Sequence, residues 1–326
     1  MDEQNGASIV ELMQMLKDEE GFSVANLYGL SDLAPEELSL FCQSWNEFGD
    51  ERKRIMIRHL ADITEENFQV DFSEIFAFCL GDRLPAVRMA ALDGLWDSER
   101  VTLIDPIVEL MISDPEEDVR TLAAATIGHF ILMAEWNQIP RRSVAPAVAA
   151  LLLLLDDETT PAPVRRAALE SLSPSSHERV SSLVEEAYDS GDQELQISAI
   201  YAMGRTVDKR WLPIVLDEME SSNDEMRLEA ARAAGHIGSS EAVSELADLA
   251  SDQDLEVRMA AVAALGQIGG STATRILGEM DGDPDFVDVQ SAIEEALEEM
   301  AWLGGEIDLS LLGWDNNQED DRFLSV

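Results

Sequence analysis

A segment of about 31 residues recurs along the chain, and this internal period limits the fold more than any other feature of the sequence. Each copy contains a basic or polar residue followed by a run rich in alanine and leucine, as in "EVRMAAVAALGQ" (256–267). From one copy to the next, this basic or polar residue recurs after 32, 45, 31, 31 and 31 residues, so one step is longer than the others. A constant period predicts a stack of similar units that bury their apolar faces on one another. We call these equivalent positions the arginine column, and in chain order they hold Arg88, Arg120, Arg165, Gln196, Arg227 and Arg258.

Each unit is expected to contain two helices. The first has apolar residues at helical spacing, such as Val243, Leu246 and Leu249, and the second is the alanine-rich segment. An acidic turn lies between them, for example "SDQDLE" at 251–256, and its aspartates can cap the second helix. The predicted fold class is therefore all-α, built from stacked helical hairpins.

The copies match the repeat pattern less well toward both ends of the repeat region. Degenerate copies at 51–63 and 288–300 place Lys53 and Gln290 in the arginine column. A terminal unit has one neighbour only and must present a polar outer face. We therefore expect a capping helix and connector at 1–35, a repeat array at 36–303, and an acidic, partly disordered tail at 304–326. Apolar residues of this tail could fold back on the last unit or dock on a partner: Ile307, Leu309, Leu312 and Trp314.

The arginine column is expected to be structural. Arg258 lies beside the acidic turn, where its guanidinium can donate to carboxylates and carbonyls of its own and adjacent units. Alanines at 260, 261, 263 and 264 permit a close approach between helices, and Gly266 and Gly269 are expected to end this helix. The predicted structural ladder consists of Arg88, Arg120, Arg165, Arg227 and Arg258.

The chain carries 66 acidic and 22 basic residues, a formal net charge of −44. Such a field repels the phosphates of nucleic acids and of anionic membranes, so direct binding to either is not expected. Two interpretations of the acidity stay open: a solubilising shell, suited to a salt-rich cytoplasm, or a surface that attracts a basic protein partner.

No secretory or membrane segment is recognisable, so the chain is expected in the cytoplasm. Cys42 and Cys79 lie singly in apolar stretches without CxxC spacing, which favours buried free thiols. No Ser-His-Asp set, phosphate loop or metal-ligand cluster is visible, and we predict neither catalysis nor a cofactor. The oligomeric state is not predicted.

The pattern "D-x-x-VR-x-AA-x-AL-G-x-IG", clearest at 223–238 and 254–269, resembles the short PBS-lyase type of HEAT-like repeat. The likeness covers about residues 36–300. It implies an α-α superhelix of about seven to eight hairpins whose alanine-rich helices line a concave side, and a non-catalytic scaffold that binds protein partners there.

Enzymatic relatives offer an alternative. Deoxyhypusine hydroxylases carry His-Glu motifs in several units, whereas His177-Glu178 is the one adjacent pair here. His129 and His236 share a column but lie three units apart. Phycobilin lyases share the repeat, and no bilin-specific motif is visible, so a lyase-like or other enzymatic role remains the alternative function.

Two groups of residues are candidate partner sites. The column expected to face the groove is chemically mixed, which suits recognition and equally suits an ordinary solvated face: Arg58, Asp93, Ala125, Glu170, Tyr201, Arg232 and Ala263. Within and beside it, Tyr201, Arg205, Arg232 and His236 are expected to converge. The enlarged step contains a group of basic and aromatic residues, Trp136, Arg141 and Arg142, which is a second candidate docking site. The alternative interpretation of this segment is a longer helix that packs on its neighbour.

Overall fold

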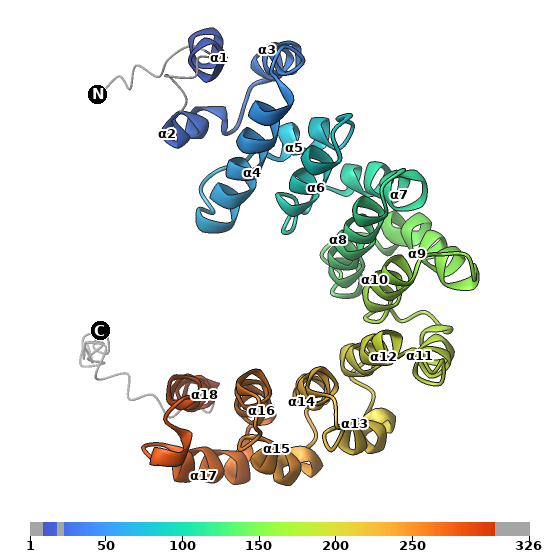
Figure 1. The fold of residues 1–326 in the computed structure, drawn as a ribbon, viewed down its shortest axis with the longest axis vertical. Coiled ribbons are helices and arrows are strands. Elements are labelled where there is room, and N and C mark those ends of the chain that lie inside the picture. Colours follow the sequence, from blue (N-terminus) through green and yellow to red (C-terminus); the bar gives the residue numbers. More distant parts are fainter. Residues whose placement is uncertain (1–8, 18–22, 304–326) are drawn as a thin grey trace, which may run out of the picture. The chain divides into compact units, whose positions relative to one another are not determined.

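The protein is helical throughout the part of the chain that its structure, a computed structural model, describes (Figure 1). The described residues are 9–17 and 23–303, and they contain no β-strand. The predicted all-α class is confirmed. The tail predicted at 304–326 lies outside the described residues, and the N-terminal segment is described from α1 (Ile9–Lys17) onward except for 18–22.

The described helices form eight hairpins, which agrees with the expected number of about seven to eight. Two short helices, α1 and α2 (Val24–Leu27), precede them. The hairpins pair α3 (Pro35–Trp45) with α4 (Asp50–Glu66), α5 (Ser73–Cys79) with α6 (Pro85–Asp93), α7 (Ile104–Ser113) with α8 (Glu117–Glu135), α9 (Arg141–Asp156) with α10 (Ala162–Leu172), α11 (Val180–Tyr188) with α12 (Gln193–Arg205), α13 (Leu212–Glu218) with α14 (Asp224–Ile237), α15 (Val243–Leu249) with α16 (Leu255–Ile268), and α17 (Gly270–Met280) with α18 (Gln290–Leu303). Single 3₁₀ turns lie at Tyr28–Leu30, Val101–Leu103, Lys209–Trp211, Ser240–Ala242 and Pro284–Phe286.

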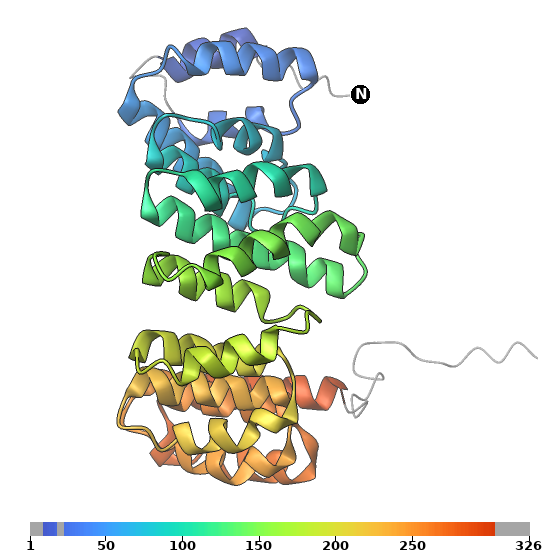
Figure 2. The same cartoon turned by 90° about the vertical axis from the view of Figure 1, so that its right-hand side faces the viewer.

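The chain divides into two compact units, residues 1–202 and 203–326, and the division falls inside α12. In the first unit the helix axes run across the direction in which the hairpins are stacked (Figure 2). We describe the two units separately and refer to them as the first and the second unit.

In the first unit, the second helices of successive hairpins pack on one another in the order α4, α6, α8 and α10. The N-terminal hairpins are filled by large aromatic side chains: Phe41, Trp45, Phe72 and Phe76 are all buried. Phe72 and Phe76 meet edge to face, with ring centroids 6.3 Å apart. Aromatic filling decreases along the unit, and alanines such as Ala123 and Ala124 allow α8 to lie close to its neighbours.

The enlarged step of the repeat lengthens one hairpin. Helix α8 continues past Gly128 to Glu135, as the sequence predicted, and α9 begins at Arg141 after Pro140. A Cβ on Gly128 would lie 2.9 Å from Ser171 Oγ, so the glycine permits the close approach of α8 and α10. The turn between α8 and α9 uses Asn137 in the left-handed region, with φ of 60°.

In the second unit, α14, α16 and α18 pack in succession behind the first helices α13, α15 and α17. Gly266 lies inside α16, and a Cβ on it would be 2.9 Å from the Cβ of Ala296 on α18. The prediction that Gly266 ends the helix was therefore wrong, because this glycine removes a side chain where two helices touch. Gly269 does follow the last helical residue, with φ of 65°.

Candidate interaction surface

The acidic turns of neighbouring hairpins are joined by basic side chains from the repeat column. In the first unit the guanidinium of Arg88 donates to both carboxylate oxygens of Asp114, each at 2.7 Å, and to the carbonyl of Asp82 at 2.9 Å. Lys53, one hairpin earlier, binds the carboxylate of Asp82 at 3.0 Å, and Trp45 Nε1 donates to the same oxygen at 2.7 Å. The side chains of both ion pairs are buried, so these contacts connect successive turns where little water is present.

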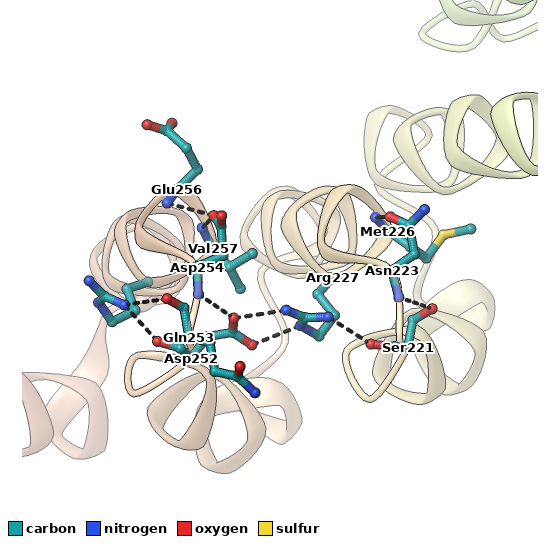
Figure 3. A network of polar contacts seen from close by, with 10 residues as sticks. Ser221, Asn223, Met226, Arg227, Asp252, Gln253, Asp254, Glu256 and Val257 are labelled. Atoms are coloured by element: carbon teal, nitrogen blue, oxygen red, sulfur yellow. Dashed lines mark hydrogen bonds and ion pairs between the residues drawn. The ribbon is translucent and has the colours of Figure 1, made fainter.

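The second unit repeats this arrangement (Figure 3). Arg227 Nε and Nη2 donate to Asp252 at 2.7 and 2.9 Å, and its Nη1 donates to the carbonyl of Ser221 at 2.9 Å. The carbonyl of Asp252 in turn accepts from Arg258 Nη1 at 2.7 Å, and Arg258 also binds the carboxylate of Asp288. Three of these aspartates each bind two cations: Asp82, Asp114 and Asp252. The carboxylate binds the cation from the preceding hairpin, and the carbonyl binds the cation that follows the aspartate's own turn.

Arg120, Arg165 and Gln196 reach backbone carbonyls only, whereas Gln290 donates to the carboxylates of Asp281 and Glu294. Arg120 Nη1 donates to the carbonyl of Asp114 at 2.7 Å, and Arg165 Nη2 donates to the carbonyl of Glu158 at 3.0 Å. Gln196 donates to the carbonyl of Tyr188 at 2.8 Å, so the amide keeps the contact with its own turn. The enlarged step separates Arg120 from the next turn in sequence. Side chains of the column therefore bind the acidic turn of their own hairpin, whereas a bond to the carboxylate of the next turn forms only between some hairpins.

The ion pairs set the protonation state of the turn carboxylates. The hydrogen bonds from Arg227 are the largest influence on Asp252 and lower its pKa below the usual value of 3.8, and the backbone N–H of Asp254 acts in the same direction. Desolvation opposes these bonds but is weaker. Asp252 is therefore ionised near neutral pH, as the ladder requires.

A hollow of about 360 Å³ lies between α14 and α16. Met259 lies on its α16 side and is 42% exposed, which is a large fraction for an apolar side chain in a folded core helix. The hollow thus combines an apolar floor with polar groups on both walls. Its lining residues are Arg232 and His236 from α14, and Glu256, Met259, Ala260, Ala263, Ala264 and Gln267 from α16.

Positive charge gathers at the α14 wall of this hollow. Arg232 is half-exposed and meets the carboxylate of Glu229 at 3.5 Å, a long distance for an ion pair. Partial burial lowers the pKa of His236, and the charges of Arg205 and Arg232 lower it further. Arg205, at the end of α12, and Arg232 and His236, on α14, therefore form one electrostatic cluster, which we call the α14 cation cluster; Arg205 is not among the residues that line the hollow. Within the described residues, Arg205 makes no ion pair.

The fourth residue expected in this cluster, Tyr201, belongs to the first unit and is half-buried; it is not among the residues that line the hollow. The groove column as a whole is solvent-accessible to different degrees. Arg58 and Asp93 bind each other at 2.7 Å across neighbouring second helices of the first unit, and Ala263 lines the hollow in the second. Ala125 is exposed and Glu170 is half-buried.

The basic and aromatic group of the enlarged step lies at the turn between α8 and α9. Trp136 is 65% exposed and Arg142 is also exposed. Arg141 binds Glu135 at 2.7 Å and Ser176 Oγ at 3.3 Å, and Glu135 accepts from the backbone N–H of Ser176 at 3.0 Å. Arg141 thus helps to fix its own turn, which leaves Trp136 and Arg142 as the side chains open to a partner.

The remaining histidines and the cysteines have local surroundings. The ring of His129 packs on Phe130, burial lowers its pKa, and its buried Nε2 has no hydrogen-bond partner. His177 Nδ1 accepts from the backbone N–H of Arg179 at 3.3 Å, which orders the start of α11. Cys42 and Cys79 are free thiols. Across residues 9–17 and 23–303, no three His, Cys, Asp or Glu side chains are placed to hold a metal ion.

Sequence reasoning did not identify Glu256, Met259 and Gln267 as parts of the surface. The repeat column gave no signal for Met259. The equivalent position, directly after the column residue, is half-buried in five other units, where it holds Met89, Thr121, Arg166, Ile197 and Leu228. Among the described helices, none is both long enough and apolar enough to cross a membrane.

A family model described as HEAT repeats matches residues 104–204 and 212–298, more than half of the chain. No match is found among curated proteins. The solved structures include yeast importin-β (Kap95p), with 16% identity and a TM-score of 0.54, where the match covers 89% of this chain and 46% of that chain.

Two further solved structures are similar. Kap95p in a study of its binding to RanGDP has 15% identity and a TM-score of 0.51, covering 90% of this chain and 44% of that chain. YibA of Escherichia coli has 14% identity and a TM-score of 0.41, covering 92% of this chain and 99% of that chain. The present chain thus spans less than half the length of importin-β, and at these identities the likeness concerns the fold alone.

Proposed function

Because this chain belongs to the HEAT-repeat family, we propose that it is a non-catalytic scaffold that holds a protein partner on the second-helix face of its second unit. The observation that carries the proposal is the hollow between α14 and α16. It offers an exposed methionine, an arginine with unused donors and a histidine within one continuous surface. Aromatic, arginine and methionine side chains are the residue types enriched at protein interfaces.

Two sets of arginines have different surroundings, one bound to the turns and one available to a partner, and this difference supports the proposal. Arg227 and Arg258 are largely buried and bound to the turns. Arg205 and Arg232 lie on the helices away from those turns, and their guanidinium groups are weakly engaged. The stack therefore does not require the α14 cation cluster for its own cohesion. The yeast solenoid that shares the fold binds RanGDP, a protein, which agrees with this use of the architecture.

Co-purification from native lysate tests the proposal. The full chain is tagged and compared with R205Q/R232Q and with a matched control, K209Q/R275Q, which removes the same number of charges from the second unit outside the hollow. We expect at least one protein to be recovered in near-stoichiometric amount with the wild-type and control chains and to be lost with R205Q/R232Q. Equal recovery with all three chains, or no stoichiometric partner, would contradict the proposal.

The same preparation distinguishes the enzymatic alternative. A tightly bound metal or an absorbing chromophore on the purified wild-type chain would favour a lyase-like or other catalytic role over the scaffold. We further propose that the scaffold acts in the cytoplasm, where its two free thiols would stay reduced. Cell fractionation with an antibody against the full chain checks this placement.

A further inference from the structure

We infer that the partner element held in the hollow is an acidic peptide segment, in which an aspartate or glutamate lies beside an apolar residue. The inference rests on the proposed function and specifies what the site selects. It differs from the expectation that net charge alone suggests, since a chain with a formal charge of −44 would be thought to favour a basic partner.

Local charge is the first argument. Arg205 has no ion pair within the described part of the chain, and the guanidinium of Arg232 makes one long contact, 3.5 Å, through Nη1. The other N–H groups of Arg232 make no hydrogen bond to a described residue. A guanidinium with free donors matches a carboxylate in geometry and can bind it through two parallel hydrogen bonds. At hydrogen-bond distance these contacts act on a carboxylate more strongly than Glu256, which lies on the opposite wall, and than the screened field of more distant acidic residues.

The opposite wall of the hollow gives the second argument. Glu256 lies on the α16 side, and Met259, Ala260, Ala263 and Ala264 form an apolar strip on the same helix. An occupant that fits both walls has a carboxylate toward α14 and an apolar side chain toward α16. Gln267, at the far end of the strip, offers an amide that can bind the peptide backbone.

Charge also separates a carboxylate from a phosphate. A phosphorylated side chain carries about −1.5 to −2 charges near neutral pH, so Glu256 across the hollow would repel it more strongly than a carboxylate with one charge. A basic peptide would place its cation beside Arg205 and Arg232. The arrangement therefore favours an acidic peptide over a phosphopeptide and over a basic segment.

Selection from a display library of random peptides tests the inference. Random 12-residue peptides are selected in parallel on the full wild-type chain, on R205Q/R232Q and on the control K209Q/R275Q. We expect aspartate or glutamate next to leucine, valine or methionine to be enriched on the wild-type and control chains and not on R205Q/R232Q. The best peptide is then synthesised with a fluorescent label, and its affinity is measured by anisotropy beside versions that carry glutamine, lysine or phosphoserine in place of its acidic residue.

We expect the glutamine version to bind at least about tenfold more weakly, which corresponds to about 1.4 kcal/mol, and the lysine version more weakly still. Enrichment of lysine and arginine, or tighter binding of the phosphoserine version, would overturn the inference and leave the scaffold in place. If no peptide is enriched on either the wild-type or the control chain above an empty matrix, the proposed function itself is contradicted.

Discussion

Arg227 and Asp252 join two consecutive hairpins through two parallel hydrogen bonds, 2.7 Å from Nε to Oδ2 and 2.9 Å from Nη2 to Oδ1. Both side chains are mostly buried, with 15% and 11% of their surface exposed. A charged pair in this position stabilises the stack only while it is complete, because either partner alone would remain desolvated without its counter-charge. The contact thus makes the order of the hairpins depend on the residues at the turns.

Replacing Arg227 by methionine should destabilise the protein by about 1 to 3 kcal/mol, since the carboxylate of Asp252 would lose two charge-assisted bonds in a site with little water. Urea unfolding followed by circular dichroism measures the change. The control is Arg275→Met, which breaks a pair with Glu279 whose side chains are 59% and 65% exposed. That pair should contribute no more than about 0.5 kcal/mol. Equal losses in the two variants would show that the Arg227 contact has no special weight.

Acid should weaken the wild-type chain more than Asp252→Asn. Arg227 lowers the pKa of Asp252 in the folded state below 3.8, so the unfolded chain takes up the proton first as the pH falls. The stability that Asp252 contributes is therefore complete above about pH 5 and is lost as the pH falls below 3.8 through the lowered folded-state pKa. Urea midpoints at pH 5 and pH 3 measure this. A loss in Asp252→Asn as large as in the wild type would refute the linkage.

Two glycines of the second unit should respond to alanine with opposite signs. At Gly266 the new Cβ would lie 2.9 Å from the Cβ of Ala296, so the helices must separate, and we expect a loss of about 1 to 3 kcal/mol. At Gly278, within α17, nothing lies within 4 Å of the new Cβ, and the better helix propensity of alanine should stabilise by up to about 1 kcal/mol. Thermal unfolding of both variants provides the measurement. Stabilisation by Gly266→Ala would show that α16 and α18 are not in close contact.

Peptide binding to the hollow should strengthen as the pH falls from 7 to 5.5. Partial burial and the neighbouring cations Arg205 and Arg232 lower the pKa of His236, so its ring is neutral at pH 7. A bound carboxylate would favour the imidazolium form, and binding would take up a proton. The affinity of the selected acidic peptide, measured by anisotropy at several pH values for the wild type and for His236→Gln, tests this. The variant should show a smaller pH dependence; equal slopes would place His236 outside the binding site.

The repeat period predicts a stack of similar units and the arginine column, and the helical spacing of the apolar residues within each unit predicts the helical class. The partner of each arginine was not predictable to the same degree. Arg120 and Arg88 occupy equivalent positions, yet only Arg88 reaches a carboxylate of the next turn. The 45-residue step after Arg120 changes the geometry of that turn, and the sequence does not reveal how.

The candidate surface was predictable only in part for a related reason. Helical spacing places Arg205, Arg232 and His236 on one side of the alanine-rich helices, and the electrostatics of His236 connect the three. Met259 and Gln267 join them through the packing distance between α14 and α16, which the small residues Gly235 and Ala264 set. The same reasoning failed at Gly266, where a glycine near the end of the alanine-rich run was interpreted as a helix end and proved to be a contact between helices.

The central claim is that cohesion and recognition use different arginines, and one paired measurement tests it most directly. The urea midpoint and the affinity for the selected acidic peptide are determined for the wild type, R227M and R205Q/R232Q. We predict that R227M lowers the midpoint while its folded fraction binds the peptide normally, and that R205Q/R232Q keeps the midpoint while its affinity falls at least about tenfold. A lowered midpoint with unchanged affinity in R205Q/R232Q would contradict the account.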